Sequence, residues 1–118
     1  MVAAAVSVSV LGRWRDARCS TAKIDLLTID TVLELHTARY GEVPTTDQGL
    51  ALLLERGFVK TALIDPWRKP YLYRQPGTHN PRGPDVGTLG GDGRSGGRGE
   101  DTDLYLGESD LRSPGCEP

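Results

Sequence analysis

The sequence is poor in the features that mark nucleic-acid-binding proteins. Aromatic residues make up only 6% of its 118 residues, too few for an obvious platform on which bases stack. Its 14 basic and 16 acidic residues give a formal net charge of −2, so the composition implies no broad basic surface. We therefore expect no nucleic-acid partner.

Patterns of catalytic residues are also missing. The two histidines, His36 and His79, have no visible nucleophile partner, and we expect His36 to be a surface or half-buried helix residue. No glycine-rich segment ends in the Gly-Lys-Ser/Thr sequence of a phosphate-binding loop. The sequence therefore does not predict an enzyme.

Cysteine is scarce, with only Cys19 and Cys116 in the chain. There is no CxxC pair and no Cys/His cluster with zinc-site spacing, so a zinc centre is not predicted. The two cysteines can pair in an oxidising compartment. Two unpaired thiols are the favoured interpretation, because Cys116 lies in a tail rich in proline and glycine.

Long hydrophobic runs are absent as well, since the apolar stretch at the N-terminus covers only Val2 to Leu11. A helix of this length spans about 15 Å, whereas the hydrocarbon layer of a membrane is roughly 30 Å thick. The stretch is interpreted as a buried helix start or as the end of a longer apolar helix. The chain as given is therefore expected to be soluble and monomeric.

The residues that are present predict a long helix followed by a small domain. From residue 22 a helical stride of apolar residues predicts a core-facing stripe of Ala22, Leu26, Ile29, Leu33 and Tyr40, widened by Ile24, Leu27 and Leu35. The opposite, solvent-facing side is predicted to carry Lys23, Asp30, Glu34 and Thr37. Gly41 and Pro44 end the helix, so residues 1–40 form the N-terminal helix and residues 41–118 the globular domain with its tail.

The segment after the helix contains a capping box, in which Thr45 is the N-cap and Gln48 reaches back to it. A short helix is predicted to follow, with Leu50, Leu53 and Leu54 on one side and Gly57 at its end. Residues 65–70 read as a turn fixed by two prolines, and residues 71–73 have the composition of a strand. The aromatic residues of this region, Trp67, Tyr71 and Tyr73, are expected in the core.

Residues 76–118 are rich in glycine, proline, aspartate and arginine, and only residues 86–89 read as a strand. This composition is typical of a flexible linker, which is one interpretation. The other is an ion-binding loop, because Asp92 lies at one end of the glycine run and Asp101 and Asp103 lie at the other. Calcium takes six to eight oxygen ligands, and glycines let backbone carbonyls turn inward. Glu100 is a reserve carboxylate, and Asp85 is assigned to the turn before the strand.

Four segments in order resemble those of one family. YGEVPTTDQGL (residues 40–50) is similar to its RYPTTEQGL segment, and DPWRKPYLYRQPG (65–77) to its DPWGNPYxYxxPG segment. DVGTLGGDG (85–93) and GGRGEDTDL (96–104) are similar to its D-[IV]-x-S-L-G-A-D-G segment and its glycine-rich acidic loop. The chain thus resembles the major pseudopilin of type II secretion. Arg68 and Lys69 stand where the family's segment has glycine and asparagine.

The resemblance implies an α+β, pilin-like fold, with a long N-terminal helix packed on a small antiparallel sheet and a glycine-rich calcium loop. It implies one Ca²⁺ bound by the side chains of Asp92, Asp101 and Asp103 and the backbone carbonyls of Leu89 and Arg94. The implied function is that of a structural subunit of the secretion pseudopilus, which supports export of folded proteins across the outer membrane. A soluble calcium-binding module, or a divergent copy that does not assemble, is the alternative.

The resemblance also implies partners and a location. The subunit would form a helical homopolymer, joined by other pseudopilins and by the inner-membrane platform of the secretion system. Its domain would lie in the periplasm, anchored in the inner membrane by the N-terminal helix. That anchor is incomplete here, because Val2 to Leu11 look like only the last turns of the family's apolar helix.

Overall fold

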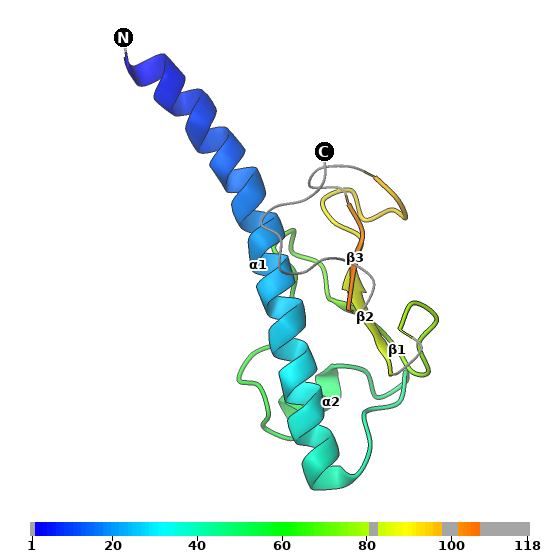
Figure 1. The fold of residues 1–118 in the computed structure, drawn as a ribbon. Helices are drawn as coiled ribbons and strands as arrows, with labels where there is room; N and C mark the ends of the chain where they lie inside the picture. Colours follow the sequence, from blue (N-terminus) through cyan, green and yellow to red (C-terminus); the bar gives the residue numbers. More distant parts are fainter. Residues whose placement is uncertain (1, 81–82, 98–101, 107–118) are drawn as a thin grey trace.

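The computed structural model describes residues 2–80, 83–97 and 102–106, with side chains from residue 17 onward. Its elements are, in chain order, helices α1 (Val2–Tyr40) and α2 (Ala51–Glu55) and strands β1 (Leu72–Arg74), β2 (Asp85–Thr88) and β3 (Leu104–Tyr105). The long helix lies beside a small antiparallel sheet, as Figure 1 shows. The α+β class with a pilin-like arrangement is therefore confirmed.

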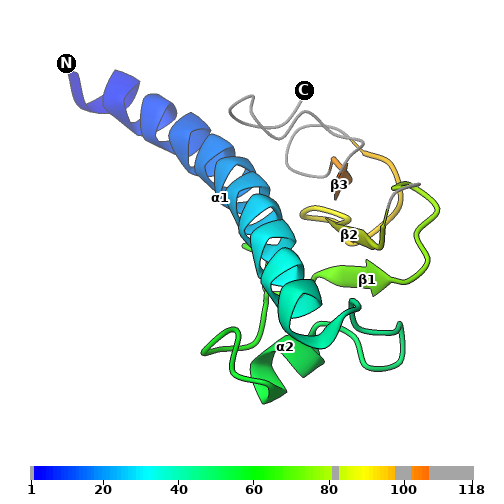
Figure 2. The ribbon, with the colours of Figure 1, turned by 60° about the horizontal axis from the view of Figure 1, so that its bottom comes forward.

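The sheet has the order β1-β2-β3, with the fully buried strand β2 in the centre. Leu72 pairs with Gly87, and Thr88 pairs with Leu104. α1 packs against β2, β3 and α2 (Figure 2). Strand β3 was not predicted, because a strand of two residues carries no alternation that a sequence pattern can reveal.

The first turns of α1 extend beyond the sheet in both views, so the molecule is elongated (Figures 1 and 2). The sheet and α2 contact only the C-terminal part of the helix (Figure 1). Across the part of the chain that the structure describes, no helix combines the length and the apolar character needed to span a bilayer.

The core is a single apolar cluster between α1 and the rest of the domain. Its buried members from α1 are Ala22, Leu26, Ile29 and Leu33, as predicted. The other elements and loops contribute Leu53, Tyr71, Val86, Leu104 and Leu106. Trp67 and Tyr73 are partly buried against this cluster, so the predicted core role of the three aromatic residues is confirmed.

The predicted width of the apolar stripe on α1 is wrong. Ile24, Leu27 and Leu35 are 63%, 44% and 57% exposed. Successive helix residues are rotated by about 100°, so Leu35 lies roughly opposite Leu26 and far from the sheet. Tyr40 shares the core side but lies at the helix end, where it is 44% exposed. Leu54, predicted on the packed side of α2, is exposed for the same geometric reason.

Two polar residues of α1 are more buried than predicted. Lys23 and His36 are only 6% and 1% exposed, because they flank the core stripe on either side and are covered with it. Arg56 donates from Nη1 to Nε2 of His36 over 2.8 Å. Since a guanidinium only donates, the imidazole proton lies on Nδ1, which donates to the carbonyl of Glu42 over 2.6 Å. His36 therefore links α1 to the end of α2.

The end of α1 follows the prediction and the capping-box hydrogen bonds form, but the prediction that Thr45 is the N-cap of the short helix is wrong, because α2 begins only at Ala51 and has no side-chain cap. Gly41 adopts a positive φ of 84°, and its N–H donates to the carbonyl of Thr37, which closes the last turn of α1. The N–H of Thr45 donates to Oε1 of Gln48, and the N–H of Gln48 donates to Oγ1 of Thr45. This reciprocal pair initiates the turns that lead into α2.

Two tyrosines join distant segments by hydrogen bonds. Tyr71 Oη donates to Oδ2 of Asp25 on α1 over 2.7 Å, and burial together with this carboxylate raises the pKa of Tyr71 well above its usual value. Tyr73 Oη donates to the carbonyl of Pro44 over 2.6 Å, and burial raises its pKa to about 12. Both tyrosines are therefore protonated at neutral pH.

Cys19 differs from the favoured interpretation. It is 1% exposed on α1, within a disulfide bond, so the expectation of unpaired thiols is wrong for this residue. Cys116, the other cysteine of the sequence, lies outside the described residues.

Candidate functional site

The candidate site is the glycine-rich loop that joins β2 to β3. Thr88, before the loop, pairs with Leu104, after it, so the two ends of the loop are neighbours in the sheet. Within the described part, Gly90, Gly93, Gly96 and Gly97 have φ between 65° and 102°, a region that favours glycine. The backbone therefore curls instead of extending away from the domain as a tether.

Asp103 anchors the curl from the β3 end. Its Oδ2 accepts a hydrogen bond from the N–H of Gly96 over 2.9 Å. Its Oδ1 is buried and has no hydrogen-bond partner. A buried carboxylate oxygen without a partner is costly, and a cation beside it would satisfy it. The residues present therefore fit a cation at this end of the loop.

The other predicted calcium ligands are arranged less completely. Asp92 is exposed, and its Oδ1 accepts from the N–H of Arg94 over 3.0 Å, which forms a local turn. Asp101 and the reserve residue Glu100 lie outside the described residues. In residues 2–80, 83–97 and 102–106, no group of three or more His, Cys, Asp or Glu side chains is placed to hold a metal. The five-residue set from Leu89 to Asp103 stays a prediction.

Asp65 connects this loop to the proline-flanked turn. Its side chain is buried, and Oδ1 accepts from the backbone N–H groups of Trp67 and Lys69 over 3.0 and 2.8 Å. Its Oδ2 accepts from Oγ1 of Thr88 over 2.6 Å, and that hydroxyl in turn accepts from the N–H of Gly90. Asp65 therefore fixes both the turn and the start of the loop. Sequence reasoning placed it only in the turn.

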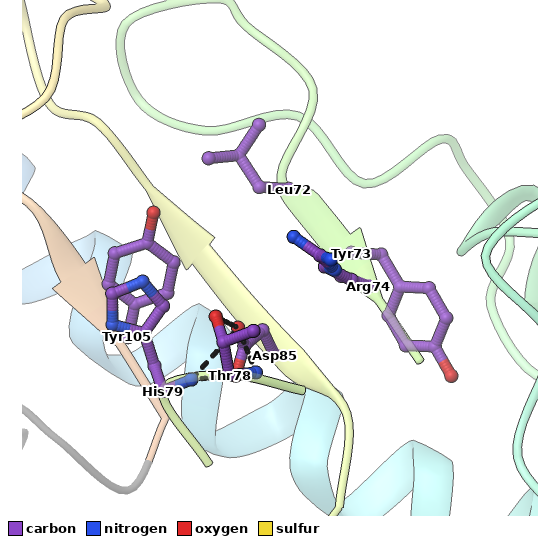
Figure 3. A pocket seen from close by; sticks show the side chains of 7 residues that line it. All are labelled: Leu72, Tyr73, Arg74, Thr78, His79, Asp85 and Tyr105. Atoms are coloured by element: carbon purple, nitrogen blue, oxygen red, sulfur yellow. Dashed lines mark hydrogen bonds between the residues drawn. The ribbon is translucent and has the colours of Figure 1, made fainter. Parts of the chain in front are cut away.

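A second carboxylate organises the loop before β2, as predicted. Asp85 accepts from the backbone N–H groups of Thr78 and His79 and from the hydroxyl of Thr78 (Figure 3). It also accepts from the backbone N–H of Asn80. Burial acts to raise the pKa of Asp85, but these donors outweigh it and lower the pKa to about 2. The carboxylate is therefore a structural anion.

Asp85 lines a pocket on the sheet side that faces away from α1 (Figure 3). The ring of His79 stacks on Tyr105 there, with centroids 4.0 Å apart and planes at 10°. The hydrogen bonds from residues 78–80 commit the Asp85 carboxylate to holding that turn, so the pocket lies over a structural carboxylate.

A comparison of the sequence with known protein families identifies the family of this chain. Residues 9–106 match the family model described as type II secretion system (T2SS), protein G. The chain belongs to this family. The core protein G of type II secretion from Pseudomonas aeruginosa is 32% identical over 117 residues, which cover 88% of this chain and 81% of that protein. The protein of the same name from Vibrio cholerae is also 32% identical, covering 88% and 78%.

A third protein G, from Aeromonas hydrophila, is 26% identical over 81% of this chain and 75% of its own length. Membership of the protein G family confirms the resemblance that the four ordered segments indicated. The match begins at residue 9, so it includes most of α1 together with the sheet and the described part of the loop. The family thus accounts for the helix-and-sheet arrangement as a whole.

Proposed function

We propose that this chain is a structural subunit of a type II secretion pseudopilus, which supports the export of folded proteins across the outer membrane. The observation that carries the proposal is the family match over residues 9–106, in which the long helix is included. The fold agrees with a role in assembly, because α1 extends beyond the domain that it helps to build (Figure 1). Neither the fold nor the relatives favour a soluble module instead.

The proposed partners are further copies of this chain in a helical homopolymer, other pseudopilins and the inner-membrane platform. The domain would lie in the periplasm, anchored in the inner membrane through the N-terminal helix. Exposed apolar residues on the outer side of α1, namely Ile24, Leu27 and Leu35, support helix-mediated contacts between subunits. Apolar groups gathered on an exposed face often mark an interaction surface.

The test is secretion by the natural host after deletion of the gene. The deletion strain is expected to retain exoproteins in the periplasm, and the wild-type gene is expected to restore their release. The double variant Ile24→Asp/Leu35→Asp should restore release poorly, whereas Leu72→Asp, a change at an exposed apolar residue on the sheet, serves as the matched control. Normal secretion in the deletion strain would contradict the proposed function.

The second part of the proposal is one Ca²⁺ in the glycine-rich loop. Its ligands are the side chains of Asp92, Asp101 and Asp103 and the carbonyls of Leu89 and Arg94, of which Asp101 lies outside the described residues. The unpartnered, buried Oδ1 of Asp103 supports this site, since calcium takes oxygen ligands. When bound, calcium would crosslink the two ends of the loop, and the residues themselves supply the curled backbone that brings those ends together.

A further inference from the structure

A lysine from a distant turn reaches into the glycine-rich loop. Lys69 Nζ donates to the backbone carbonyl of Gly91 over 3.3 Å, and the lysine side chain is half-buried. A Cβ atom added to Gly93 would lie 2.5 Å from Nζ and 3.2 Å from Cε of the same lysine. The end of the lysine side chain therefore occupies the space directly beside Gly93.

The backbone of Lys69 is held rigidly at its base. Its N–H donates to Oδ1 of Asp65 over 2.8 Å, and its carbonyl accepts from the N–H of Asp65 over 2.7 Å. Asp65 is itself buried and fixed to Thr88 at the end of β2. The turn that carries Lys69 is therefore hydrogen-bonded to the end of β2, the strand that the loop follows. This turn holds the ammonium group beside the loop.

The contact depends on charge more than on ideal geometry. At 3.3 Å it is longer than the usual hydrogen-bond range of roughly 2.7–3.2 Å, but the donor is an ammonium group and the acceptor a carbonyl in a curled, glycine-rich backbone. Lysine is a compact point charge with three donors on a flexible stem, so it can follow the loop. The family's segment has an asparagine at this position, which carries no charge.

We propose that Lys69 is a built-in cationic tether of the glycine-rich loop, which orders the loop without calcium and weakens calcium binding to it. The second half of this inference rests on the proposed calcium site. A positive charge fixed beside the loop repels a divalent cation, and this cost is avoided when the side chain is neutral. In this chain the loop therefore depends less on calcium than it would with the uncharged residue of the family's segment.

The experiment compares full-length wild type with Lys69→Met, which keeps much of the apolar stem, and Lys69→Asn, which installs the residue of the family's segment. Lys60→Met, at an exposed position, is the matched control. Each protein is melted in chelator and is titrated with calcium chloride by calorimetry at one fixed ionic strength. Trypsin cleavage after Arg94 reports the order of the loop, and Lys69 itself is a poor trypsin site because Pro70 follows it.

With chelator present, both Lys69 variants are expected to melt a few degrees lower than the control and to be cut several-fold faster after Arg94. Their calcium affinity should be higher than that of wild type by roughly tenfold, since a unit charge near a divalent ion is worth on the order of a factor of ten. The control should match wild type in every measurement.

The outcomes separate the tether from the calcium site. If no protein binds calcium but the Lys69 variants are cut faster in chelator, the calcium site and the predicted weakening are both wrong, while the ordering role of Lys69 stands. If all proteins bind calcium with equal affinity and are cut at equal rates, the tether is overturned and the calcium site is retained. Equal behaviour of Lys69→Met and Lys60→Met in chelator overturns the ordering role in either case.

Discussion

The helix–sheet core and the glycine-rich loop are stabilised by different interactions. The core consists of aliphatic and aromatic side chains from α1, α2 and the sheet that bury one another. The loop has one large apolar side chain in residues 89–97, that of Leu89, and is held by polar contacts to Thr88, Lys69 and Asp103. The packing of the core should therefore not require ions, whereas the order of the loop should respond to charge and to calcium.

The largest effect is expected from a cavity in the core. Leu26 is 0% exposed and lies in the middle of the α1 stripe, so Leu26→Ala should lower the free energy of unfolding by about 2–5 kcal/mol. Leu35→Ala removes the same atoms from the exposed side of the same helix and should change it by less than about 0.5 kcal/mol. Urea unfolding measures both. Equal losses would show that α1 buries both faces.

The next effect tests the link between the core and the loop. Asp65→Ala removes the acceptor for Trp67, Lys69 and Thr88, and the expected loss of unfolding free energy is about 3 kcal/mol. Because the start of the loop depends on Thr88, trypsin cleavage after Arg94 should accelerate together with the loss of stability. A variant that loses stability while the cleavage rate stays that of wild type would show that the loop is ordered independently of Asp65.

Calcium should bind to the loop and thereby stabilise the folded chain as a whole. A ligand that binds only the folded state at a hundredfold excess over its Kd stabilises it by about 2.7 kcal/mol, so wild type should melt several degrees higher in calcium than in chelator. Asp92→Ala and Asp103→Ala should lose this rise. Magnesium should substitute poorly, because it requires a tighter octahedron and keeps its waters. Identical wild-type melting with and without calcium would contradict the site.

The difference between core and loop also explains which features were predictable from the sequence. The bounds of α1, the hydrogen bonds between Thr45 and Gln48 and the stripe from Ala22 to Leu33 depend on local spacing, and they were predicted correctly, whereas the start of α2 was not. The exposure of Ile24 and Leu35 was not predicted correctly. The width of the helix face that is buried depends on how much of the sheet packs against α1. That quantity is a property of the whole fold.

The candidate site was predicted as a region more than as a set of contacts. Asp103 and the glycines of the loop were recognised from their spacing, since they lie close together in the chain. Lys69 was not, because it reaches Gly91 from 22 residues away through a turn fixed by Asp65. Contacts of this kind depend on the register of β2 with its neighbours, which no local pattern of residues reveals.

The smallest effect concerns the second loop carboxylate and appears only in acid. The pKa of Asp85 is lowered from 3.8 to about 2 in the folded chain, because four donors outweigh the effect of burial. A folded-state pKa below the unfolded value means that the stabilisation is complete above pH 3.8 and is lost as the pH falls toward 2. The loss should be about 2 kcal/mol, since each pKa unit corresponds to about 1.4 kcal/mol. Asp85→Asn should show a correspondingly weaker dependence of unfolding free energy on pH in this window, whereas Asp30→Asn, at an exposed position on α1, should follow wild type.

Parallel curves for wild type and Asp85→Asn would mean that the donors of residues 78–80 do not depend on the charge of Asp85. Because Asp85 contacts neither Asp65 nor Lys69 by any hydrogen bond described for it, the same curves should be unchanged by calcium, which separates the loop before β2 from the loop after it.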